Sequence, residues 1–284
     1  MSDSLYDRTA EAAAAAVIGA YSTSFGMAAR LLGPRVRTHV RNIYALVRVA
    51  DEVVDGAAEA AGLPPASQRR VLDELEAETL SAIARGFSAN LIVHAFCRTA
   101  RECGIDGEQV RPFFASMRTD LERTSHDAAS HDDYVYGSAE VVGLMCLQVF
   151  VNAGAPAPVR PPADLVDGAR RLGAAFQDVN FLRDHADDAN RLGRDYLGVS
   201  SGRESREHVL DRIDADLDAA AAVIDDLPPD CRRAVLTAHG LFASLSRRLR
   251  ARGDAEGRVR VPGAVKATIA ARAAAGIRPR RSLA

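Results

Sequence analysis

Two pairs of aspartates have the residue type and spacing needed to bind a metal ion. Asp51 and Asp55 stand four residues apart in the stretch RVADEVVDG, and Asp184 and Asp188 repeat this spacing in FLRDHADDANR. Residues four apart in a helix lie one turn apart on the same face. Like charges placed so repel each other, and beside apolar neighbours the cost rises unless a cation compensates it. A solvated helix face explains one such pair more readily than two.

Each aspartate pair belongs to a longer polar stripe at helical spacing. The first stripe consists of Tyr44, Arg48, Asp51 and Asp55. The second consists of Gln177, Asn180, Asp184 and Asp188, with Arg183 beside it. Mg²⁺ takes oxygen ligands and is usually held by one or two carboxylates together with substrate phosphates. Two facing acidic helices therefore predict bound Mg²⁺, or Mn²⁺ in its place, with a diphosphate that the arginines also contact.

Three other interpretations compete with a magnesium site. Arg48 and Arg183 could neutralise the aspartates as purely structural salt bridges. A calcium loop is disfavoured because the residues after Asp184 lack the alternating acidic pattern and the glutamate at the twelfth position. A His-Asp phosphohydrolase is disfavoured because the two His-Asp pairs of SHDAASHDDY, at His126 and His131, do not share a helical face.

Helices are expected to position both stripes. Alanine is abundant, alternating β-branched runs are scarce, and Gly-Pro or Pro-Pro pairs separate the segments. The predicted helices are 8–32, 35–57, 67–85, 89–103, 107–122, 131–153, 163–190, 205–226, 229–252 and 263–275. We expect a single all-α domain over residues 1–277, followed by a basic, disordered tail at 278–284. No run of about 18 consecutive apolar residues occurs, so no membrane-spanning helix is expected.

The distribution of charge and cysteine bears on partners and location. The formal net charge is −2, yet the segment from Cys231 to Ala284 carries 12 arginines and one lysine against two acidic residues. Without interleaved aromatic residues or a known motif, nucleic acid is not an expected partner. A solvated helix face or peripheral contact with an anionic membrane both fit. Four cysteines without paired spacing and the absence of a signal peptide favour a cytoplasmic protein, and peripheral membrane contact would place it at the inner face of the cell membrane.

Four blocks of the sequence occur together in the order typical of one family. They are YSTSFGMAARLL at 21–32, IYALVRVADEVVDG at 43–56, YVYGSAEVVGLM at 134–145 and FQDVNFLRDHADDANRLGRDYL at 176–197. The sequence resembles the squalene/phytoene synthases, the head-to-head prenyltransferases of isoprenoid metabolism, and is most similar to the bacterial phytoene synthases among them. The resemblance spans nearly the whole chain, and the last block is the most diagnostic.

The resemblance implies a fold and a site. The fold would be a single-domain helical bundle of the isoprenoid synthase type, with a central apolar cavity and the aspartate helices facing each other across its mouth. The implied metal ligands are Asp51, Asp55, Asn180, Asp184 and Asp188. The implied contacts to prenyl diphosphates are Tyr21, Ser22, Thr23, Ser24, Phe25, Tyr44, Arg48, Gln177, Arg183, Arg194 and Tyr196. The implied catalytic residues are Asp51, Asp55, Asp184, Asp188, Arg48 and Tyr44.

The sequence departs from the family pattern at a few positions. Glu52 stands where relatives often have a second aspartate, but it lies off the metal stripe. Leu192 is an extra residue before GRDYL, and Gly198 replaces a common proline. Phe242 stands where many relatives have tyrosine, which would remove a hydroxyl contact from the wall of the site.

Chain length of the substrate should depend on the cavity wall. Gly26 and Ala29 are small, so they predict room for C20 geranylgeranyl diphosphate, which would be converted through prephytoene diphosphate to phytoene for a downstream desaturase in carotenoid biosynthesis. The same chemistry on farnesyl diphosphate would give squalene, dehydrosqualene or presqualene diphosphate. The remaining alternatives are a head-to-tail prenyltransferase, a class I terpene cyclase, and a catalytically inactive relative acting as an assembly factor.

Overall fold

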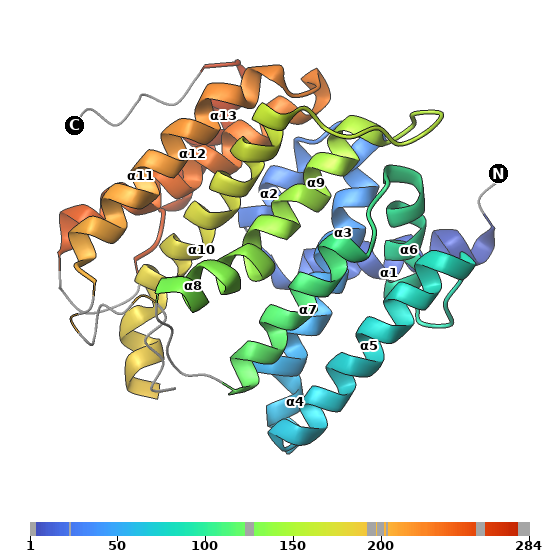
Figure 1. Cartoon of the computed structure of the whole chain (residues 1–284). Coiled ribbons are helices and arrows are strands. Elements are labelled where there is room, and N and C mark those ends of the chain that lie inside the picture. Colours follow the sequence, from blue (N-terminus) through green and yellow to red (C-terminus); the bar gives the residue numbers. More distant parts are fainter. Residues whose placement is uncertain are drawn as a thin grey trace.

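The computed structural model describes residues 4–22, 24–122, 128–191, 197, 202, 204–253 and 259–277. For residues 24, 128, 129 and 185–191 it describes the backbone alone. All regular structure in these ranges is helical, which confirms the predicted all-α class (Figure 1). The tail at 278–284 lies outside the described residues.

The helices follow the predicted order closely. In the first half they are α1 (Leu5–Tyr21), α2 (Ser24–Arg30), α3 (Pro34–Asp55), α4 (Ala57–Ala60), α5 (Pro65–Arg85), α6 (Leu91–Cys103) and α7 (Gly107–Glu122). In the second half they are α8 (Ala128–Val135), the π-helix η1 (Tyr136–Glu140), α9 (Val141–Asn152), α10 (Ala163–Arg191), α11 (Arg206–Val223), the 3₁₀-helix η2 (Ile224–Asp226), α12 (Pro229–Arg252) and α13 (Gly263–Ala274).

A break divides the helix predicted over 8–32 into α1 and α2. Ser22 has extended backbone angles, with φ −128° and ψ 118°. Its Oγ accepts a hydrogen bond from the backbone N–H of Gly26 at 3.2 Å. A serine side chain that binds a nearby backbone group competes with the helical ladder, which explains the end of α1 at this point.

A widened π-turn, η1, interrupts the helix predicted over 131–153. At this turn the chain approaches α7 so closely that Gly137 cannot be replaced without a shift: a Cβ there would lie 2.3 Å from the backbone oxygen of Pro112. Single π-turns inserted in α-helices occur frequently at functional sites. Here Ser138 and Ala139 of the turn, and the first residues of α9 after it, line the cavity described below.

The stretch from Ser130 to Asn152 is apolar and long enough to cross a membrane by length and composition alone. In the structure it is α8, η1 and α9, and side chains such as Val141, Met145 and Leu147 are buried in the core. A helix buried in a protein core needs the same apolar composition as a membrane-spanning helix, so it passes the same test of length and composition.

Two large clusters of buried side chains form the core. The first is built mainly from α3, α5, α6, α7 and α9 and contains Phe96, Phe113 and Met145. The second surrounds α10, α11 and α12 and contains Ile213 and Leu249. Residues of both clusters line the cavity described below, which therefore lies between them.

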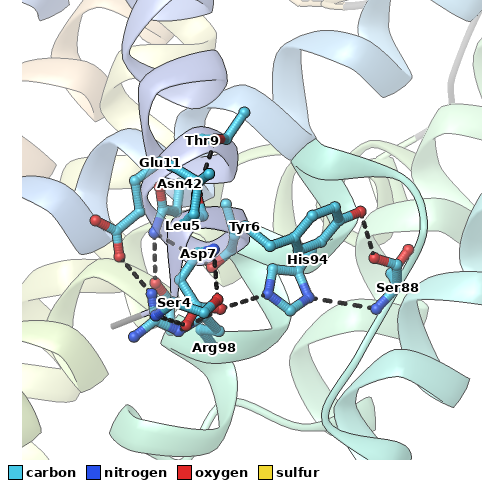
Figure 2. Close-up of polar contacts among 12 residues, drawn as sticks. Ser4, Leu5, Tyr6, Asp7, Thr9, Glu11, Asn42, Ser88, His94 and Arg98 are labelled. Atoms are coloured by element: carbon cyan, nitrogen blue, oxygen red, sulfur yellow. Dashed lines mark hydrogen bonds and ion pairs between the residues drawn. The ribbon is translucent and has the colours of Figure 1, made fainter. Parts of the chain in front are cut away.

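The N-terminal helix α1 is joined to the rest of the bundle by a buried histidine (Figure 2). His94 Nδ1 accepts a hydrogen bond from the backbone N–H of Ser88, so Nε2 carries the proton and donates to Asp7 Oδ1 at 2.8 Å. Tyr6 donates to the backbone oxygen of Ser88 at 2.9 Å. Arg98 of α6 pairs with Glu11 of α1 at 2.8 Å.

Asp7→Asn should destabilise this junction. The hydrogen bond from His94 lowers the pKa of Asp7 below its ordinary value, so the carboxylate stabilises the fold above about pH 4 and this stabilisation is lost as the pH falls further. We expect the variant to lose about 1–2 kcal/mol of unfolding free energy near neutral pH and less near pH 3. Urea unfolding at both pH values, with exposed Glu74→Gln as the control, checks this. An equal loss at both would contradict it.

Candidate active site

A cavity of about 280 Å³ lies between the two core clusters. Its described lining comes from α2, α3, η1, α9, α10, α11, η2 and α12. Most of the described lining side chains are apolar, and those that carry a hydroxyl or amide are Ser138, Gln177 and Asn180. A dry wall of this kind suits a long hydrocarbon chain and excludes water from a reactive intermediate.

Helix α10 shows how the wall and the polar rim are connected. Its lining residues recur at steps of three and one along a single face and are Leu165, Gly168, Ala169, Leu172, Gly173, Phe176, Gln177 and Asn180. Asp184 follows Asn180 by one turn. The second polar stripe is thus the continuation of the face that lines the cavity.

Helix α3 repeats this arrangement. Val40 and Val47 line the cavity, Tyr44 lies between them at helical spacing, and Asp51 follows Val47 by one turn. Both aspartate motifs therefore begin one turn beyond residues that line the same cavity. Each polar stripe thus continues a helix face that forms part of the apolar wall.

Small residues let the helices approach closely around the cavity. A Cβ on Gly143 would lie 2.7 Å from the backbone oxygen of Ala169, and one on Gly173 would lie 2.8 Å from that of Ala139. Ala29 lines the wall as predicted. Gly26 does not belong to the described lining, because its missing Cβ would point toward α1.

In the first motif, Arg48 holds two carboxylates. It donates to Asp51 at 2.7 Å and to Glu52, and its guanidinium lies 4.5 Å from the centre of the Tyr21 ring. Burial, opposed by the charge of Arg48 and reinforced by those of Asp55 and Glu52, raises the pKa of Asp51 to about 6. Since 40% of the Asp51 side chain is still exposed, a ligand can reach its oxygens.

Glu52 has a structural role that its position off the stripe did not predict. Besides pairing with Arg48, it accepts a hydrogen bond from the backbone N–H of Ala57 at 3.1 Å, at the first residue of α4. Gly56 leaves room for this contact, because a Cβ there would lie 2.5 Å from Glu52 Oε2. The spacing of Glu52 from Arg48 and from Gly56, four residues in each direction, is the signal that could have indicated it.

The predicted segment from Tyr21 to Phe25 lies beside this motif. The Tyr21 ring is half exposed to solvent, and the Arg48 guanidinium lies over it. Ser22 forms a hydrogen bond with Tyr44. Burial raises the pKa of Tyr44 above its ordinary value, and the bond to Ser22 opposes that shift. Thr23 lies outside the described residues, and Ser24 is described as the first residue of α2 without its side chain.

Aromatic rings join four helices at the cavity. The Phe25 ring lies 6.4 Å from Tyr44 and meets Phe176 edge to face at 6.0 Å. Phe176 in turn stacks on Phe242 at 3.7 Å. Phe242, which replaces the family's tyrosine, therefore packs face to face against a ring of α10. Such faces can stabilise a cation in a dry site.

In the second motif, Arg183 binds Asp184 through two hydrogen bonds, of 3.0 and 2.6 Å. Gln177 and Asn180 line the cavity. Asp188 belongs to α10, but only its backbone is described. Arg194 and Tyr196 lie outside the described residues. Within the described side chains, no three Asp, Glu, His or Cys groups are arranged to hold a metal.

The donor set nevertheless fits Mg²⁺. Its members are oxygen donors, and Mg²⁺ needs only one or two protein carboxylates when a substrate diphosphate supplies the others. The crowding of Asp51 with Asp55 and Glu52 is the kind of unfavourable charge density that a bound cation relieves.

An all-helical bundle around an apolar cavity, with two aspartate-bearing helices at its rim, defines the isoprenoid synthase class. Residues 18–201 match the squalene/phytoene synthase family. Over 264 residues the chain is 31% identical to the 15-cis-phytoene synthase of a Paracoccus species, which covers 84% of this chain and 82% of that protein. Over 259 residues it is 30% identical to the phytoene synthase of Pseudescherichia vulneris, with 82% and 80% covered.

Solved structures share the fold. A dehydrosqualene synthase superposes with a TM-score of 0.79 at 20% identity and covers 95% of this chain and 97% of that one. A squalene synthase from Alicyclobacillus acidocaldarius gives 0.73 at 19% identity, covering 88% and 96%. The chain belongs to the squalene/phytoene synthase family and is a prenyltransferase.

Proposed function

We propose that this prenyltransferase joins two geranylgeranyl diphosphates head to head, through prephytoene diphosphate, to give phytoene in carotenoid biosynthesis. The observation that carries the proposal is the apolar cavity walled by Ala28 and Ala29, with both polar stripes at its rim. Its relatives named phytoene synthase, at 30% and 31% identity, support the same product.

Each polar residue has a role in this proposal. Asp51, Asp55, Asn180, Asp184 and Asp188 would hold Mg²⁺, or Mn²⁺, and the bound ion supplies Lewis-acid stabilisation of the leaving diphosphate. Arg48 and Arg183 now pair with carboxylates of their own motifs. When a diphosphate binds, their guanidinium groups would turn to its oxygens and bind them bidentately.

The cavity wall would govern the carbocations. When the allylic C–O bond of one substrate breaks, C1 becomes cationic, and the double bond of the second substrate attacks it. Loss of a proton closes the cyclopropane of prephytoene diphosphate. A second ionisation, rearrangement and proton loss give the 1–1′ linked hydrocarbon, so two diphosphates and two protons leave in total. Phe25 and Phe176, which line the cavity, and the neighbouring Tyr44 would stabilise the cation through their rings, and the apolar wall would keep water away.

Product identification tests the proposal. The purified protein is incubated with Mg²⁺ and either the C15 or the C20 prenyl diphosphate, with and without a reduced nicotinamide cofactor. We expect phytoene from the C20 substrate, and no requirement for the reductant. Preference for the C15 substrate would refute the assignment of substrate length, and the hydrocarbon formed from it would identify the alternative product.

The raised pKa of Asp51 predicts a pH dependence of metal binding. A carboxyl group that titrates near pH 6 is protonated below that pH, and a protonated group does not bind Mg²⁺. We expect the apparent dissociation constant for Mg²⁺ with inorganic diphosphate to rise about tenfold per pH unit below about pH 6. Calorimetric titration measures this, and Asp51→Asn should flatten the dependence. A constant affinity down to about pH 5 would contradict the role of Asp51.

A further inference from the structure

The deep end of the cavity lies opposite the aspartate motifs. Its buried floor includes Leu32 before α3, Phe150 in the last turn of α9, Leu227 after η2 and Ala234 in α12. Leu32 follows α2, on which Phe25 contacts Tyr44 of the first stripe, and it precedes α3, which carries Asp51 and Asp55 at its other end. A prenyl chain bound by its diphosphate at the rim would therefore end against this floor.

One arginine outside the cavity, Arg35, connects the segments that form the floor. Arg35 binds Asp230 through Nε and Nη2, both at 2.9 Å, which joins the start of α3 to the start of α12. Its Nη2 also donates to the backbone oxygen of Phe150 at 3.0 Å, and Nη1 donates to that of Ala153 at 2.9 Å. These two carbonyls belong to the end of α9, where the helix leaves its last oxygens without internal partners.

The contacts of Arg35 with Phe150 and Asp230 lie at or near floor residues. Phe150 is a floor residue itself. Ala234 follows Asp230 by one turn on the same face of α12. Leu32 precedes Gly33, whose N–H donates to the backbone oxygen of Asp230 at 2.8 Å and whose missing Cβ would lie 2.6 Å from the Asp230 Cβ.

We infer that Arg35 limits the length of the prenyl chain by holding the ends of α3, α9 and α12 together beneath the cavity. Arg35 is a positioning residue, because it contacts the floor from outside and does not line the described cavity. Without it, the last turn of α9 loses two donors and Asp230 loses its cation. The floor can then withdraw when a longer chain enters. This inference rests on the proposed function and adds the element that sets its substrate length.

The test compares chain-length selectivity, which a general loss of stability would not alter. kcat/KM is measured for the C20 and C25 prenyl diphosphates below the melting temperature of every variant. Arg35→Leu is expected to raise the C25 to C20 ratio about tenfold, the effect of small changes in an apolar pocket. Asp230→Asn, which keeps the shape of the side chain and loses its charge, should shift the ratio in the same direction by less.

Arg85→Leu is the matched control. Arg85 also joins a carboxylate, Glu78, and a backbone oxygen, that of Phe87, but at the end of α5, away from the described cavity lining. The C25 to C20 ratio of kcat/KM for Arg85→Leu should equal that of the wild type. If Arg35→Leu does not fold, Asp230→Asn decides the question. An unchanged ratio in the folded variants, beside a wild type that converts the C20 substrate, would overturn the role of Arg35 and leave the proposed function standing. A wild type inactive on every prenyl diphosphate would overturn both.

Discussion

Replacing Asp51 or Asp184 by asparagine is expected to lower kcat/KM on the C20 substrate by at least about 100-fold, the usual cost of removing one group that stabilises a developing charge. Both carboxylates lie one turn beyond residues that line the cavity, and both are partly exposed to a ligand there. An amide keeps the size of the side chain but loses the charge that Mg²⁺ requires.

The fold should survive both substitutions. Removing the charge of Asp51 relieves its repulsion with Asp55 and Glu52, and Asp184 gives up a pair with Arg183 that is partly exposed. Steady-state kinetics and thermal unfolding, measured on the same preparations, separate the two effects. Asp164→Asn, an exposed carboxylate in the first turn of α10, is the control and should keep full activity. Undiminished turnover in Asp51→Asn or Asp184→Asn would contradict the metal site.

Ala29→Phe is expected to reverse the choice of substrate. The Ala29 methyl is buried in the wall, and only 6% of the residue is exposed. A phenyl ring at this position would project into a cavity of about 280 Å³ and shorten the space for a chain. We expect kcat/KM for the C20 diphosphate to fall about 100-fold relative to the C15 diphosphate.

A competition assay with both diphosphates, followed by product analysis, measures this ratio directly. Gly26→Ala is the matched control, because it lies on the same helix but its added Cβ would point toward α1, with ordinary spacing of 3.8 Å from the backbone oxygen of Ile18. The control should retain the wild-type preference. If Ala29→Phe keeps the C20 preference too, this part of the wall does not set substrate length.

The helical architecture could be predicted because it depends on local signals. α3 starts at Pro34 and α5 at Pro65, one and two residues before the predicted starts at 35 and 67, because proline is favoured in the first helical turn. The break at Ser22 and the π-turn at Gly137 were missed. The first depends on a serine that binds a backbone N–H, and the second on the close approach of α7, which lies more than a dozen residues earlier in the chain.

In the candidate site, too, the local features could be predicted from the sequence and the contacts between helices could not. The polar stripes of α3 and α10 could be read from helical spacing, because one helix face is a local property. Helical spacing could also have indicated the pairing of Arg48 with Glu52, which lie on one helix. It could not have indicated that Phe242 stacks on Phe176, because these rings belong to two different helices. Such contacts depend on which rotamers and helix faces meet after packing.

By itself, the sequence determined the all-helical class, the two aspartate stripes and the family to which the chain belongs. Only the tertiary structure decided that Ala28, and not Gly26, lines the cavity beside Ala29, and that Arg35 joins three helix ends beneath it. The physical reason is that helical periodicity is set by neighbouring residues, whereas the depth and wall of a cavity are set by how far the chain's distant segments approach one another.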